Sequence, residues 1–209
     1  MFRSMPDRLR RRWDFDDLEA TEHRLRAQLE EEPDDAGCAE VLTQLARVQA
    51  LRGDFDGCDE LLAQAEELAG ASEIADVRIK LERGRRLRSS GEAPASVPLF
   101  EAAFEDALAN ELYYLAGDAA HMVAIADPEQ MIAWTERGLA LADAEPDAAY
   151  WAGPLLNNLG WHYFEAGDHE AALTAFERAL EVRERDPTNV DAIAFAREAV
   201  ETARQALGR

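Results

Sequence analysis

Residues 155–187 read LLNNLGWHYFEAGDHEAALTAFERALEVRERDP, and they predict two antiparallel helices joined by a tight turn. Gly167-Asp168 supplies the turn, because glycine ends a helix readily and aspartate caps the helix that follows. Gly160 is small where the two helices would cross most closely, and the Phe176 ring would fill the space beside it. The stretch therefore predicts one helix–turn–helix unit.

The same spacing recurs upstream. It fits residues 42–70, with a turn at Gly53, and residues 81–104, with a turn at Gly91. A weaker copy fits residues 116–146. The turns lie about 40 residues apart, where a minimal unit of this kind has about 34, and we expect the second helix of each unit to be extended.

Residues 155–187 resemble the tetratricopeptide repeat, through Leu159-Gly160, Tyr163, Ala172, Phe176 and Pro187. The resemblance implies an all-α fold: a right-handed α-α superhelix, a solenoid of about four helix–turn–helix units with single flanking helices. The phrases LERGRRLRSSG, DAAHM and NNLGW are also similar to a group of bacterial tetratricopeptide proteins of unassigned function. That likeness brings no activity with it.

On this reading residues 1–209 form a single repeat domain. Pro98 conflicts with the second helix of the repeat over 77–108. Ser96 as N-cap would place Pro98 in the first turn, and we expect this helix to start late or to be bent there. The expected parts are a basic arm over 1–12, an N-terminal helix over 13–33, repeats over 39–70, 77–108, 112–146 and 153–187, and a C-terminal capping helix over 188–208.

Composition and charge exclude several classes of protein. The net charge of −21 repels nucleic-acid phosphates and anionic lipid. Only two cysteines occur, and Cys58 falls in an apolar helical pattern, so no disulfide framework is indicated. The absence of a signal peptide and of a long apolar stretch predicts a cytoplasmic protein with no membrane contact. The acidity is equally consistent with a saline cytoplasm.

Five arginines in residues 1–12 form the basic arm. They would serve either as a docking arm for an acidic partner or as a charged strand that folds back on the acidic body; a solvated, fraying terminus is the third alternative. These arginines are Arg3, Arg8, Arg10, Arg11 and Arg12.

A ladder of polar side chains is expected on the concave side, because the first helix of each unit lines that side in this fold. Its members form pairs three residues apart, which share one helix face. Arg88 would extend the second pair. The predicted partner-binding groove is Gln44, Arg47, Glu82, Arg85, Arg88, Asp118, His121, Asn158 and Trp161.

The ladder has two interpretations. It offers hydrogen-bond donors and acceptors to a protein or peptide partner, or it pairs internally, Arg47 with Glu82 and Arg85 with Asp118, while Trp161 packs. The family's clamp for a C-terminal carboxylate is poorly matched, since no lysine falls on the ladder.

A small-ligand or enzymatic groove is the alternative function, in which Glu82, Asp118 and His121 act as acids, bases or ligands. No HExxH, phosphate loop, nucleophile elbow or Cys-x-x-Cys supports it. We therefore expect a non-catalytic interaction module with no catalytic residues, metal or cofactor.

Overall fold

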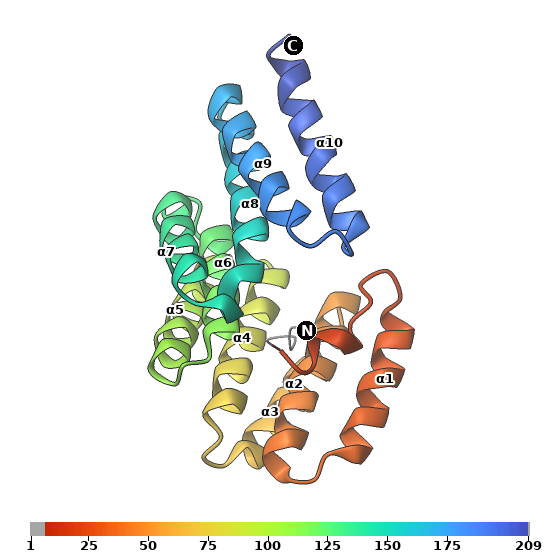
Figure 1. Cartoon of the computed structure of the whole chain (residues 1–209). Helices are drawn as coiled ribbons and strands as arrows, with labels where there is room; N and C mark the ends of the chain where they lie inside the picture. Colours follow the sequence, from red (N-terminus) through yellow and green to blue (C-terminus); the bar gives the residue numbers. More distant parts are fainter. Residues whose placement is uncertain (1–6, 209) are drawn as a thin grey trace.

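The computed structural model describes residues 7–208, and no strand occurs among them (Figure 1). Residues 1–6, with Arg3 of the basic arm, and residue 209 lie outside this description. Two short 3-10 helices, η1 (Arg10–Arg12) and η2 (Pro146–Trp151), accompany ten α-helices. These are α1 (Leu18–Glu31), α2 (Asp35–Arg52), α3 (Phe55–Ala69), α4 (Glu73–Ser89), α5 (Ala93–Ala109), α6 (Tyr113–Ala126), α7 (Met131–Ala144), α8 (Ala152–Glu165), α9 (His169–Glu184) and α10 (Val190–Ala206).

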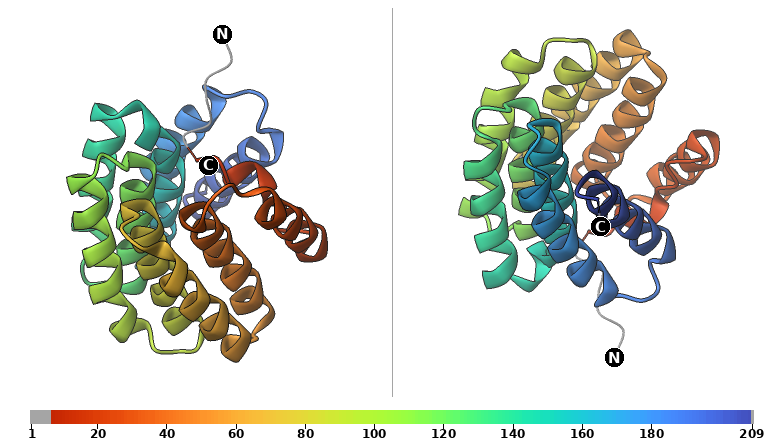
Figure 2. Two further views of the ribbon diagram at one scale, coloured as in Figure 1. Left: turned by 90° about the horizontal axis from the view of Figure 1, so that it is seen from below. Right: turned by 90° about the horizontal axis from the view of Figure 1, so that it is seen from above.

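Consecutive helices pair as α2 with α3, α4 with α5, α6 with α7 and α8 with α9. The first helices α2, α4, α6 and α8 also touch one another in turn, whereas the second helices make no such contacts within the described chain. The pairs consequently form an arc with the first helices on its inner side (Figure 2). The predicted all-α solenoid is confirmed.

Glycine ends three of the first helices. Gly53, Gly91 and Gly167 have φ angles of 81°, 92° and 82°, in the left-handed region that residues with a Cβ adopt at a cost. After the first and last of these turns, the carboxylates of Asp54 and Asp168 accept hydrogen bonds from the first-turn amides of α3 and α9. The turns thus follow the chemistry of the sequence.

The wide spacing of the turns has a different source from the one predicted. Within the units, α3 has 15 residues against 18 in α2, α5 has 17 like α4, α7 has 14 like α6, and α9 has 16 against 14 in α8. Further residues between α7 and α8 form η2, which contacts α6, α7 and α8. A second helix longer than its first is therefore found only in the last unit, α8 and α9.

Two helix starts also differ from the prediction. Helix α5 begins at Ala93 with Pro94 in its first turn, and the Ser96 hydroxyl donates to the Ala93 carbonyl, so Ser96 is not its N-cap. Pro98 then lies inside the helix at an exposed position. Helix α1 begins only at Leu18, capped by Asp17, and residues 13–17 lie outside it.

Four clusters of buried apolar side chains fill the space between the helices. The Cys58 thiol lies in one of them, and burial raises its pKa to about 12, as befits a core residue. Helix α10 packs on α9 through Ala199, Val200 and Ala203. Among the described residues, no helix is both long and apolar enough to cross a bilayer.

The crossing of α8 and α9 gives a test of the predicted register. A Cβ at Gly160 would overlap the Phe176 ring, whereas a Cβ at Gly153 would meet only the Arg183 side chain, at 3.4 Å or more. Gly160→Ala should lower the free energy of unfolding by about 1–3 kcal/mol through overpacking. Gly153→Ala, in the same helix, should leave it nearly unchanged. Denaturant unfolding of both variants measures this, and equal stabilities would contradict the register.

Candidate functional site

Residues 7–15, here called the N-terminal segment, lie on the concave side of the solenoid. Leu9 is only 1% exposed and belongs to the core cluster built by α1, α2 and α4. The Trp13 indole donates to the Gln44 side chain of α2 at 2.9 Å. Three alternatives were open for the basic arm. Its described residues, 7–12, follow the second of them, in which the charged segment folds back on the body of the protein.

Arg78 of α4 holds the N-terminal segment through a buried ion pair. Its guanidinium lies 2.7 Å from Asp7 Oδ1 and 3.1 Å from Glu40 Oε2, and the residue is 3% exposed. Arg8 adds contacts with Glu40 at 3.1 Å and Glu32 at 2.6 Å. Such a network is favourable only while each buried charge keeps its partners.

Arg85, two helical turns later on α4, forms a second buried network. It pairs with Glu82 on its own helix and with Asp118 of α6. Although burial acts against the charged form, the nearby Arg85 and Arg47 guanidiniums hold the pKa of Asp118 below its ordinary value. The predicted pairing of Arg85 with Asp118 is present. The carboxylates of Glu82 and Asp118 both form ion pairs with Arg85.

Arg47 has no ion pair with any residue in 7–208, so the predicted Arg47–Glu82 pair is wrong. Its guanidinium instead lies over the rings of Trp13 and Phe15, at 5.0 and 5.4 Å from their centroids. Burial, followed by the charge of Arg85, lowers its pKa. The geometric reason is that Glu82 turns to Arg85 while the N-terminal segment brings aromatic rings to Arg47.

Arg10 is the other arginine here without a carboxylate partner among the described residues. Its guanidinium lies 5.5 Å from the Phe15 centroid and 5.8 Å from that of Tyr150, and it donates to the Tyr150 hydroxyl at 3.5 Å. Phe15 and Tyr150 are 48% and 41% exposed. These three residues, here called the aromatic rim, present rings and a cation to solvent.

A cavity of about 200 Å³ lies between the N-terminal segment and the inner helices. Six of the nine predicted groove residues line it, and they come from three first helices. The lining residues from the prediction are Gln44, Arg47, Glu82, Arg85, Asp118 and His121.

The other three predicted groove residues lie elsewhere. Arg88 is exposed and does not line the cavity. Asn158 lies behind it, where its amide donates to His121 Nε2 at 2.8 Å. Trp161 is partly buried and packs edge-on against Phe164 and Phe176, at centroid distances of 5.5 and 5.0 Å, beside the core cluster of α9 and α10.

Sequence reasoning missed several lining residues. Arg78, Tyr114 and Pro154 each lie four residues before a predicted ladder position, one helical turn earlier on the same face. Extending the ladder by one turn would have found them. Tyr150 and Trp151 lacked such a signal, since η2 interrupts the repeat, and Trp13 and Phe15 were assigned to a helix.

His121 is the titratable imidazole of the site. Burial lowers its pKa to about 4, so the ring is neutral at pH 7. Because Nε2 accepts from Asn158, the hydrogen of the neutral ring is on Nδ1, which is buried without a hydrogen-bond partner. The ring lies 5.3 Å from Trp151. A group with so low a pKa is a weak general base at neutral pH.

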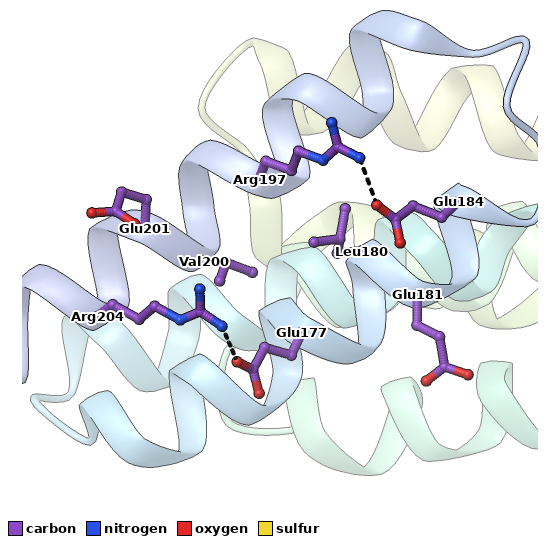
Figure 3. A pocket seen from close by; sticks show the side chains of 8 residues that line it. All are labelled: Glu177, Leu180, Glu181, Glu184, Arg197, Val200, Glu201 and Arg204. Atoms are coloured by element: carbon purple, nitrogen blue, oxygen red, sulfur yellow. Dashed lines mark hydrogen bonds and ion pairs between the residues drawn. The ribbon is translucent and has the colours of Figure 1, made fainter. Parts of the chain in front are cut away.

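Two further observations limit the chemistry of the site. No group of three or more His, Cys, Asp or Glu able to hold a metal ion occurs within residues 7–208. A larger open groove, about 410 Å³, runs between α9 and α10 (Figure 3). Its arginines already face carboxylates, Arg197 with Glu184 and Arg204 with Glu177. These exposed pairs leave the concave cavity as the better candidate.

Comparison with known proteins agrees with the geometry. The tetratricopeptide repeat family profile matches residues 119–185. Among solved structures, BtubC (BKLC) from P. vanneervenii superposes with a TM-score of 0.61 at 17% identity, over 97% of this chain and 85% of that one. At this identity the likeness concerns the fold alone. No curated protein matches the sequence.

The buried imidazole makes stability depend on pH. With a folded pKa of about 4 and an unfolded pKa near 6.5, the unfolded chain binds the proton first, so the folded state loses stability as pH falls from about 6.5 towards 4. Asp118 opposes the shift, while Arg85, Arg47 and Arg88 reinforce it.

Between pH 7 and pH 5, wild-type protein should therefore lose about 2 kcal/mol more unfolding free energy than His121→Gln. Denaturant unfolding at the two pH values measures the difference. Equal losses in both proteins would contradict the neutral, buried imidazole.

Proposed function

We propose that this chain, whose residues 119–185 match the tetratricopeptide repeat family, is a non-catalytic interaction module whose concave side binds a protein or peptide partner. The aromatic rim carries this proposal. Arginine and tyrosine dominate binding energy at protein interfaces, and here Arg10, Phe15 and Tyr150 form one partly exposed group on the inner side of the solenoid.

The proposal gives the predicted groove residues two different roles. Glu82, Arg85 and Asp118 are buried and paired, so they support the site from beneath. Asn158 fixes His121 from behind. The partner would instead contact the rim and the concave surface of α8 beyond the cavity, where Asn158 and Trp161 are only partly buried.

The charge of the chain narrows the class of partner. A net charge of −21 disfavours nucleic acid and anionic membrane surfaces. We therefore propose a protein or peptide met in the cytoplasm. The neutral His121 and the paired Glu82 and Asp118 give no acid–base pair for catalysis, which supports a binding role.

The structure also guides the choice of test variants. Arg85→Ala would leave two buried carboxylates without their cation, and Trp161→Ala would open the core between α8 and α9. Either would weaken binding merely by unfolding the protein. Exposed positions avoid this, because surface substitutions usually change stability little.

Phe15→Ala and Tyr150→Ala should reduce partner capture about tenfold or more, since truncated interface hot spots cost about 2 kcal/mol. Phe195→Ala on α10 is the matched control, because Phe195 is 50% exposed and distant in sequence from the rim. Proteins retained from a lysate of the source cell by each immobilised variant, quantified by mass spectrometry, measure the effect. A partner lost with Phe195→Ala but kept by both rim variants would place the working surface elsewhere.

A further inference from the structure

The cavity beneath the N-terminal segment contains more cation than its own carboxylates pair. Four arginines line it, Arg10, Arg47, Arg78 and Arg85, against the three carboxylates of Asp7, Glu82 and Asp118. Arg78 and Arg85 use all three of these carboxylates. Arg78 also pairs with Glu40 outside the lining. The lining itself thus has one cation more than it has carboxylates, and Arg10 and Arg47 are the two arginines in it without an ion pair to a described residue.

These two arginines converge on one ring. The guanidiniums of Arg10 and Arg47 lie 5.5 and 5.4 Å from the Phe15 centroid. Contact with a ring attracts each cation, but it stabilises a partly desolvated charge less than a carboxylate would. An anion placed near both would satisfy them.

Neutral donors in the same wall add a second, independent observation. Trp151 Nε1 and His121 Nδ1 are buried donors without a hydrogen-bond partner among the described residues, and both side chains line the cavity. One acceptor of the lining, Glu82 Oε2, is also buried without a hydrogen-bond partner. Buried donors in folded proteins are nearly always paired. The rings of Tyr114 and Trp151, 5.4 Å apart, offer an apolar wall beside them.

We propose that this cavity binds a small organic monocarboxylate, with its anionic group at Arg10 and Arg47 and its apolar body against Tyr114 and Trp151. Glu82 and Asp118 in the same lining disfavour a dianion such as a phosphate ester. The volume suits one ring with a carboxylate, since an apolar cavity of about 150 Å³ holds benzene. This proposal does not depend on the proposed protein or peptide partner, so either proposal can fail without the other.

The carboxylate could belong to a free molecule or to a peptide C-terminus. The cavity lies between the N-terminal segment and the helices, and Arg10, which contacts the rings of both Phe15 and Tyr150, lines it with them and links the segment to η2 as a cover. A free molecule fits beneath this cover, whereas a peptide would have to displace it. The assignment is therefore to the free molecule.

Calorimetric titration of the full-length chain with benzoate tests the proposal, with propionate as a smaller probe and benzamide as the uncharged analogue. Benzoate or propionate should bind with a Kd of about 1 mM or lower, and benzamide about tenfold more weakly. Failure of both carboxylates to bind by about 10 mM, or equal binding of benzamide, would overturn the proposal.

Arg47→Met removes the charge while keeping most of the aliphatic stem. It should weaken carboxylate binding about tenfold or more, whereas Arg178→Met, an exposed site on α9 with the same change of charge, should not. Without ligand, Arg47→Met should melt close to wild type, because the change breaks no ion pair and removes only the ring contacts and a charge near Asp118. Equal weakening by both variants would show a general charge effect and refute the site.

A short acetylated peptide ending in a free phenylalanine carboxylate separates the two sources. The free-molecule assignment requires it to bind more weakly than benzoate. Tighter binding by the peptide, abolished by Arg47→Met, would transfer the site to a peptide terminus and overturn the assignment.

Discussion

The buried guanidinium of Arg78 is the constraint on which the concave side depends. A buried cation needs carboxylates around it, and one of the two partners of Arg78, Asp7, belongs to the N-terminal segment, 71 residues away in the sequence. The repeats alone would supply only Glu40, which Arg8 also contacts. The N-terminal segment is thus part of the folded solenoid, and the positions of Leu9, Trp13 and Phe15 follow from this attachment.

This attachment separates the arginines of the inner helices into two kinds. Arg78 and Arg85 are neutralised by carboxylates and bind the helices together, whereas Arg47 meets only aromatic rings. The tryptophan and phenylalanine beside Arg47 come from the segment that Asp7 anchors. The Asp7–Arg78 ion pair thus anchors the N-terminal segment, and the segment in turn covers Arg47 with rings and closes the cavity where we place the proposed ligand.

The repeat architecture could be predicted from the sequence because it rests on local size and turn chemistry. Gly160 faces Phe176, and Gly84 faces Phe100 at the same spacing of 16 residues, and both contacts are present. The six lining residues on α2, α4 and α6 followed from helical periodicity. The Arg85–Asp118 pair was predicted, but the partner of Glu82 could not be, because Arg47 and Arg85 compete for Glu82 and only tertiary packing decides.

Other parts were missed because the relevant interactions are long-range. Trp13 and Phe15 have a helical pattern with Leu18, but their contacts with Arg47 exist only once the solenoid has formed. Pro146 indicates the end of a helix, and nothing nearby shows that it also begins η2 and brings Tyr150 and Trp151 to the cavity. Segments outside the repeat pattern thus supply most of the rings of the site.

Amide hydrogen exchange of residues 7–13 tests most directly whether the N-terminal segment is built into the concave side. The Leu9 amide donates to the Asp7 carboxylate, and those of Arg10, Arg12 and Trp13 donate to backbone carbonyls within the segment. If the docked arrangement is the native state, these amides should exchange as slowly as those at the ends of α2 and α4. Exchange at the rate of a free peptide would contradict it.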